Sequence, residues 1–129
     1  MKYTNKLVNA EPGSFHILDV AKAKRLNAKT LYIPSVADVV EAIRAIPQGT
    51  VRASEEVRTE IAIKHGADLC CPAKFKSFWR WSAYAMEQEK GPALPWWRMT
   101  KSGKPYDQLP GGAEQHAELI SSEQNSKPE

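Results

Sequence analysis

The clearest hydrophobic pattern in the chain is an apolar stripe at helical spacing after residue 35. The stripe consists of Val36, Val39, Val40, Ile43 and Ile46. Ser35 suits the N-cap position before it, and Asp38 stands three residues later in a box-like arrangement. Pro47 follows the stripe, and proline disfavours helical geometry at the residue before it. The pattern therefore predicts a helix between Ser35 and Pro47.

Two more helices are predicted from similar signals. Ser54 suits the N-cap of the first, which would turn Val57 and Ile61 inward and reach Gly66, a residue suited to a left-handed helix end. The second opens at Pro72 and ends near Gly91. Its inward positions follow the spacing i, i+3, i+4, i+7 and i+11. They are Phe75, Phe78, Trp79, Ser82 and Met86.

The remaining segments are short. Residues 50–52 form a brief extended step, residues 101–104 have the composition of a turn, and a last short helix follows Pro110. The order is helix, short strand, helix, turn, helix and a hairpin-like wing. This order is typical of a winged helix-turn-helix, so the predicted fold is mainly α with a small β wing.

The domain organisation follows from where the pattern begins and ends. Residues 1–30 lack sustained periodicity and hold scattered lysines, so we expect an N-terminal basic arm. Residues 31–123 would form the winged-helix domain. The polar residues 124–129 are expected to be a disordered tail.

Composition narrows the class of protein. A chain of 129 residues with 42% hydrophobic residues suits one soluble domain, and no apolar run approaches bilayer length. No signal-peptide core follows the basic N-terminus, so a cytoplasmic location without membrane attachment is expected. Cys70 and Cys71 are adjacent, which disfavours a disulfide, and the three histidines lack ligand spacing. We expect neither metal nor cofactor.

Charge is unevenly distributed. The net charge is only +3, but residues 71–104 carry seven basic residues against two acidic ones, a local net charge of +5. Aromatic residues are interleaved with these cations, a pattern that favours binding to a polyanion. The cations at the centre of this stretch are Lys74, Lys76 and Arg80. The alternative is that they are ordinary solvated surface residues.

Three stretches in register resemble a known family. Residues 46–51 read I-P-Q-G-T-V, residues 94–99 read L-P-W-W-R-M, and Gly103 and residues 110–112 (P-G-G) precede Gln115, Leu119 and Glu123. These stretches resemble the DNA-binding domain of the alkylguanine-DNA alkyltransferases and the alkyltransferase-like proteins over roughly residues 34–123. The stretch 65–72 adds a resemblance to short bacterial members of that superfamily that lack an assigned activity.

The resemblance implies that the protein is not an enzyme. Family members transfer an alkyl group from guanine to a cysteine thiolate that a neighbouring histidine activates. Trp96 stands at the cysteine position of this chain and Trp97 at the histidine position. Indole has no nucleophilic lone pair and no group that ionises near neutral pH. Suicidal alkyl transfer through this loop is therefore excluded on chemical grounds.

The same loop is the candidate lesion pocket. Tryptophan also replaces the cysteine in several alkyltransferase-like proteins, which bind damaged DNA and hold a flipped base. The resemblance implies a pocket made by Pro95, Trp96, Trp97 and Arg98. Because consecutive residues of an extended segment face opposite sides, we expect Trp96 to line the pocket and Trp97 to lie in the core. The resemblance also implies that Arg98 is largely structural and braces the loop through its planar guanidinium.

The candidate DNA contacts lie on either side of this loop. Lys74, Lys76 and Arg80 would contact phosphates or base edges from the third helix, and Lys101 and Lys104 would reach phosphates from the wing. Ser54 stands where family members carry a tyrosine that turns the target phosphate. Their intercalating arginine has no clear counterpart here, which leaves base flipping open.

Three function hypotheses follow. The first is a non-catalytic protein that binds double-stranded DNA and senses alkylated guanine for repair. The second is a protein-interaction module that keeps the fold, has lost DNA binding and uses an aromatic surface around Trp81 and Tyr84. The third is an enzyme that uses Cys70 or Cys71, against the simpler interpretation that one thiol is buried and the other incidental.

Overall fold

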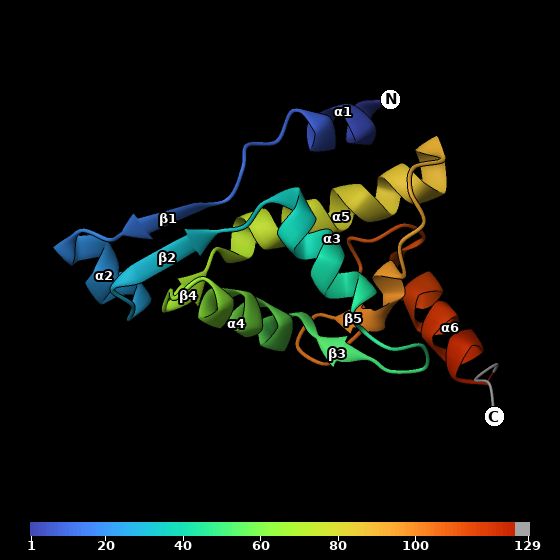
Figure 1. Cartoon of the computed structure of the whole chain (residues 1–129). Coiled ribbons are helices and arrows are strands. Elements are labelled where there is room, and N and C mark those ends of the chain that lie inside the picture. The colour runs from blue at the N-terminus through green and yellow to red at the C-terminus, as the bar shows by residue number, and fades with distance from the viewer. Residues whose placement is uncertain (126–129) are drawn as a thin grey trace.

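The long helix α5 (Pro72–Glu89) runs through the centre of the molecule, and α1 (Lys2–Val8) and α3 (Val36–Arg44) pack against it (Figure 1). The computed structural model describes residues 1–125. The other helices are α2 (Val20–Leu26), α4 (Ser54–Lys64) and α6 (Gly112–Asn125). The strands are β1 (Ser14–Ile17), β2 (Thr30–Ile33), β3 (Arg52–Ala53), β4 (Leu69–Cys70) and β5 (Met99–Thr100). The fold is mainly helical with two small sheets, as predicted at this coarse level.

Helix α3 begins and ends where its sequence predicts. The Ser35 hydroxyl accepts the Asp38 backbone N–H at 3.0 Å, and the Asp38 carboxylate accepts the Ser35 backbone N–H at 2.9 Å. This reciprocal capping box satisfies two backbone donors at the start of the helix. Val39 and Ile43 are fully buried, so the predicted stripe faces the core.

Helix α4 begins one residue earlier than predicted. Its N-cap is Ala53, and Ser54 is already the first helical residue, so the Ser54 hydroxyl caps nothing. The physical reason is strand β3, which pairs in parallel with β5 and holds the chain extended through Ala53. At the other end, Gly66 has a φ of +69°, which confirms the predicted left-handed helix end.

Helix α5 buries the face that its spacing predicts. Phe75, Phe78, Trp79 and Ser82 are buried, and Met86 is half-buried against the same core. Lys90 ends the helix in a left-handed conformation, and the Gly91 backbone N–H donates to the Ala85 carbonyl at 2.9 Å. The predicted end near Gly91 is confirmed.

The sequence did not reveal the larger sheet. β1 pairs antiparallel with β2, and β2 pairs in parallel with β4, so the strand order is β1-β2-β4. The predicted wing is a tight turn rather than a long hairpin. Lys101 and Lys104 form one bridge across Ser102 and Gly103, which have φ values of +53° and +79°.

Residues 1–30 are more ordered than the N-terminal basic arm that we predicted, in which only a short piece around residues 15–20 was open to being ordered. They form α1, β1 and α2, and α1 packs on α5. The Glu89 carboxylate accepts the backbone N–H groups of Tyr3 and Thr4 at 3.0 and 2.8 Å. An isolated seven-residue helix is too short to be stable in water, so these tertiary contacts hold α1 in place.

The predicted C-terminal tail also needs a correction. Residues 124 and 125 belong to α6, and residues 126–129 lie outside the part of the chain that the structure describes. No helix among residues 1–125 combines the length and apolar character needed to cross a membrane.

Candidate functional site

The two adjacent tryptophans exchange the roles predicted for them. The chain makes a short 3₁₀ turn at Trp96–Arg98, in which Arg98 N–H donates to the Pro95 carbonyl at 3.1 Å. Trp96 is 0% exposed and lies in the core. Its indole N–H donates to Glu87 at 3.1 Å, and its carbonyl accepts the Trp79 indole N–H at 3.0 Å. The prediction that Trp96 lines a pocket is therefore wrong, because a turn replaces the extended segment that we assumed.

Trp97 is the tryptophan that reaches a surface hollow. It is half-buried, and together with Pro95 and Arg98 it lines an open hollow of about 360 Å³. Arg44 and Met86 complete its walls. The indole of Trp97 meets that of Trp96 edge to face, with 5.8 Å between ring centroids. Pro95, Trp97 and Arg98 thus line one hollow, as predicted. Trp96, the fourth predicted pocket residue, is buried and packs against Trp97.

Arg98 braces the loop, in the structural role that its position predicts. Its Nε and Nη2 donate to the two carboxylate oxygens of Glu123 at 2.9 and 2.8 Å, and its Nη1 donates to the Ile46 carbonyl at 2.9 Å. The side chains of Arg98 and Glu123 are only 16% and 13% exposed. The hydrogen bonds from Arg98 lower the pKa of Glu123. We call this arrangement the Arg98 clamp.

The Arg98 clamp joins the three stretches that carry the family resemblance. Arg98 belongs to the second stretch, Ile46 to the first and Glu123 to the third. The Gly49 backbone N–H also donates to Glu123, at 3.2 Å. Comparison of the chain with models of protein families, with curated proteins and with solved structures found no match. Functional inference therefore rests on the contacts of this chain alone.

His116 is a buried polar residue beneath the same loop. Its Nδ1 accepts the Tyr106 backbone N–H at 2.9 Å, and its Nε2 lies 3.0 Å from the Trp97 carbonyl. The first contact needs an unprotonated Nδ1, which leaves the proton on Nε2 to donate to Trp97. Burial lowers the pKa of His116. The neutral His116 ring thus connects α6 to Trp97 and to Tyr106, which lie before and after the turn at residues 101–104.

We expect the protein to lose stability as the pH falls below about 6.5, the ordinary pKa of histidine. Below this pH the histidine takes up a proton in the unfolded chain, whereas His116 of the folded protein has a lowered pKa and stays neutral. Protonation therefore stabilises the unfolded state relative to the folded state. The loss approaches at most about 1.4 kcal/mol per pH unit until the folded pKa is reached. Urea unfolding at pH 7 and pH 5 measures it. His116→Gln, which keeps an acceptor and a donor, should flatten this dependence, and an unchanged slope would contradict it.

The predicted cations of α5 lie on two different sides of the helix. Lys74 is exposed and lines a hollow beside the N-terminal segment, together with Lys6 and Trp81. Lys76 and Arg80 are half-buried and lie on either side of Trp79 in sequence. These three residues therefore do not form one continuous basic face.

The turn at residues 101–104 is linked to α5 through Tyr106. The Lys101 ammonium lies 5.2 Å from the ring centroid of Tyr106, and Tyr106 stacks on Trp79 with 5.3 Å between centroids. Lys104 is exposed at the end of the same turn. Within residues 1–125, none of the five predicted DNA-contacting cations forms an ion pair. Their charges are not neutralised by neighbouring side chains.

Ser54 lies close to the turn but is not accessible. It is 1% exposed, and its hydroxyl donates to Glu55 at 3.2 Å. Glu55 also accepts the Ser102 backbone N–H at 2.8 Å, and this bond anchors the turn to the start of α4. Ser54 therefore offers no hydroxyl to a phosphate. The role of Glu55 in holding the turn could not be predicted from the sequence.

The two cysteines differ in their burial. Cys70 is buried in strand β4, and burial raises the pKa of its thiol to about 12. Cys71 is half-buried at the N-cap of α5. Both thiols are free, and no group of three potential metal ligands is found among the described residues.

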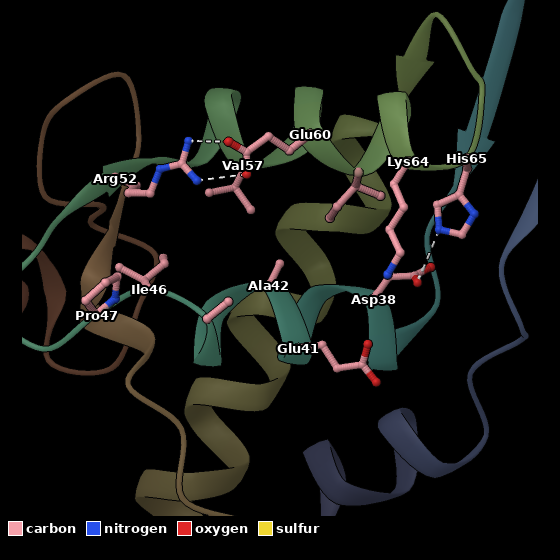
Figure 2. A pocket seen from close by; sticks show the side chains of 12 residues that line it. Asp38, Glu41, Ala42, Ile46, Pro47, Arg52, Val57, Glu60, Lys64 and His65 are labelled. Carbon is pink, nitrogen blue, oxygen red and sulfur yellow. Dashed lines mark hydrogen bonds and ion pairs between the residues drawn. The ribbon is translucent and has the colours of Figure 1, made fainter.

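A polar cluster that sequence reasoning missed lies between α3 and α4. The Tyr32 hydroxyl donates to Asp38 at 2.6 Å, and the Tyr32 ring stacks on His65 with 3.8 Å between centroids. Figure 2 shows His65 and Asp38 at one end of a pocket of about 290 Å³, and Arg52 with Glu60 at the other. Although burial raises the pKa of Asp38, hydrogen bonds from Tyr32 and Ser35 lower it overall.

The aromatic surface predicted for a protein partner is covered by the chain itself. Tyr3 of α1 stacks on Tyr84 with 4.9 Å between ring centroids. The ammonium of Lys6 lies 4.9 Å from the ring centroid of Trp81. Trp81 and Tyr84 thus contact α1 and are half-buried, and Trp81 also lines the hollow beside Lys74.

Proposed function

We propose that this protein is a non-catalytic winged-helix DNA-binding protein of the alkyltransferase-like kind, with a preference for duplexes that contain an alkylated guanine. The observation that carries the proposal is the Arg98 clamp. It gathers in one place the three stretches, 46–51, 94–99 and 110–123, that carry the family resemblance. Convergence of all three is expected if they are one inherited site.

In this proposal α4 and α5 take the places of the helix-turn-helix pair, and the turn at residues 101–104 takes the place of the wing. Lys101 lies over Tyr106, which stacks on Trp79 of α5, and Lys101, Lys76 and Arg80 supply the phosphate contacts. The α1-covered side of α5 stays away from DNA. Binding is therefore mainly electrostatic and falls steeply with salt.

The hollow beside Trp97 is the proposed lesion pocket. A base extruded from the duplex stacks on the indole of Trp97, between Pro95 and the aliphatic part of Arg98. No transfer chemistry follows, because Trp96 and Trp97 stand where a thiolate and its base would be needed and the Cys70 thiol has a pKa of about 12. The lesion is held rather than repaired.

A protein-interaction module is the second candidate, supported by a different surface from the one first predicted. Ile17 and Val20 are 83% and 87% exposed, and Phe15 is 49% exposed, all on or beside the edge strand β1. Exposed apolar side chains beside an unpaired strand edge are typical of a contact site for another chain. This candidate predicts no salt-sensitive DNA binding.

Titration with short duplexes, plain and with one alkylated guanine, at low and moderate salt, tests the DNA proposal. Trp97 is the tryptophan expected to report on binding, because it lines the proposed lesion pocket, whereas Trp79 and Trp96 are fully buried and Trp81 lies beside α1. We expect fluorescence quenching that is stronger with the alkylated duplex and absent in Trp97→Phe. No binding at low salt would refute DNA binding and favour the interaction module.

Charge variants separate specific contacts from general attraction. The double variant Arg80→Gln with Lys101→Gln removes two proposed phosphate contacts and should reduce the salt dependence of log K by about 2. The matched control is Lys22→Gln with Lys24→Gln on α2, which removes the same charge from two exposed lysines at the far end of the molecule (Figure 1). Equal effects of both pairs would contradict a defined binding face.

A further inference from the structure

An aliphatic pocket lies beneath α1. Its volume is about 420 Å³, within the range of small-molecule sites in proteins. Its walls come from α1, α3, the middle of α5 and the loop that follows α5. The apolar part of the lining is aliphatic throughout, and includes Leu7, Val36, Val40, Ala85, Pro92 and Leu94. We call it the aliphatic pocket.

One buried hydroxyl in this pocket has no partner. Ser82 of α5 lines the pocket and is 7% exposed, and its Oγ makes no hydrogen bond to any described residue. A serine within a helix commonly donates to the backbone carbonyl four residues earlier, and Ser82 does not. A buried hydroxyl without a partner is costly, so its presence here points to a bound oxygen atom.

The other polar side chains of the lining already have partners. The Thr4 hydroxyl donates to Glu89 at 2.8 Å, and the Arg44 guanidinium donates to the Ala93 carbonyl at 3.1 Å. Arg44 and Thr4 belong to α3 and α1, whereas Ser82 lies on the buried face of α5 with Ala85. Ser82 is therefore the only polar side chain of the lining that is left without a partner.

We propose that the aliphatic pocket binds a neutral aliphatic molecule with one hydroxyl or carbonyl oxygen, which hydrogen-bonds to Ser82. The aliphatic walls select the hydrocarbon part through burial from water. The ligand is neutral because a charge beside Ser82 would lose its hydration among apolar side chains. The absence of aromatic rings from the lining disfavours a flat, stacked ligand. This site does not depend on DNA binding.

The outer wall of the pocket is held by few contacts. Thr4, Leu7 and Val8 of α1 form this wall, and α1 is attached through Glu89 and the stacking of Tyr3 on Tyr84. The ligand therefore contacts α1 and α5 together. Binding should strengthen the attachment of α1, since a ligand that binds only the closed arrangement stabilises it.

Titration of the full chain with hexanol, followed by amide chemical shifts in NMR spectra, tests the site. We expect shifts confined to α1, α3, the middle of α5 and the loop that follows α5. Binding should be about fivefold weaker in Ser82→Ala, because one hydrogen bond is lost. The control Ser77→Ala changes a half-buried serine of α5 outside the pocket and should leave binding unchanged. Equal affinity in wild type and Ser82→Ala would overturn the proposal.

Further variants test the location of the site and the unpaired state of the Ser82 hydroxyl. Val40→Phe fills the pocket and should abolish binding, whereas Ile63→Phe, at an exposed position of α4, should not. Ser82→Ala should also raise the thermal midpoint of the unliganded protein, since it removes an unpaired buried hydroxyl. Titration with hexanoate, which carries a negative charge, tests whether the ligand is neutral. Tighter binding of hexanoate than of hexanol, lost in Arg44→Ala, would assign the pocket to aliphatic acids and overturn the proposal.

Discussion

Arg98→Ala should lower the free energy of unfolding by about 3–5 kcal/mol, the range found when one partner of a buried ion pair is removed. The variant leaves the Glu123 carboxylate, 13% exposed, without its guanidinium, and the Ile46 carbonyl without its donor. The cost is mainly that of an uncompensated buried charge. Urea denaturation at neutral pH, monitored by circular dichroism, measures it.

Arg52 provides the matched control. It also makes two hydrogen bonds to one glutamate, Glu60, at 2.8 and 2.6 Å, but the side chain of Glu60 is 59% exposed. Water solvates that carboxylate when the arginine is removed, so Arg52→Ala should cost no more than about 1 kcal/mol. Similar losses in the two variants would mean that burial does not set the strength of the Arg98 clamp.

Substitution of Trp96 should mainly lower stability, whereas substitution of Trp97 should mainly affect DNA binding. Trp96→Ala removes a fully buried side chain and should lower the free energy of unfolding by about 3–5 kcal/mol. Trp97→Ala removes a half-buried ring from the edge of a hollow and should cost about 1 kcal/mol. The same urea experiment compares them.

For the preference between DNA duplexes, the substitution at Trp97 should have the larger effect. Under the proposed function, Trp97→Ala abolishes the preference for the alkylated duplex, whereas the milder Trp96→Phe keeps the core filled and the preference intact. Trp96→Phe still loses the hydrogen bond to Glu87, so a small loss of stability accompanies it. Retained preference in Trp97→Ala would exclude the hollow beside Trp97 as the lesion pocket.

Local signals predicted the helices of the domain well. The Ser35 and Asp38 capping box and the left-handed Gly66 depend on contacts within one turn, which the sequence displays directly. The buried face of α5 is visible for the same reason, because spacing alone defines it. The bracing role of Arg98 was implied by the family resemblance, in which an arginine at this position is largely structural.

Features set by distant contacts were not predictable. Strands β3, β4 and β5 have two residues each, too few for a recognisable alternation. Helix α1 depends on Glu89, which is 85 residues away from Thr4 in sequence. The exchange of roles between Trp96 and Trp97 depends on Glu87 and on the 3₁₀ turn, and neither leaves a sign in the loop itself.

The Arg98 clamp also governs when the chain completes its fold during synthesis. Arg98 and Glu123 are 25 residues apart, and Glu123 and Gly49 are 74 apart. A chain leaves the ribosome N-terminus first, so the guanidinium has only the Ile46 carbonyl as a partner until α6 emerges. Closure of such distant contacts is slow compared with helix formation. Until α6 has emerged, the nascent chain therefore has formed helices beside an open loop at Trp96–Arg98 and an arginine without its carboxylate partner.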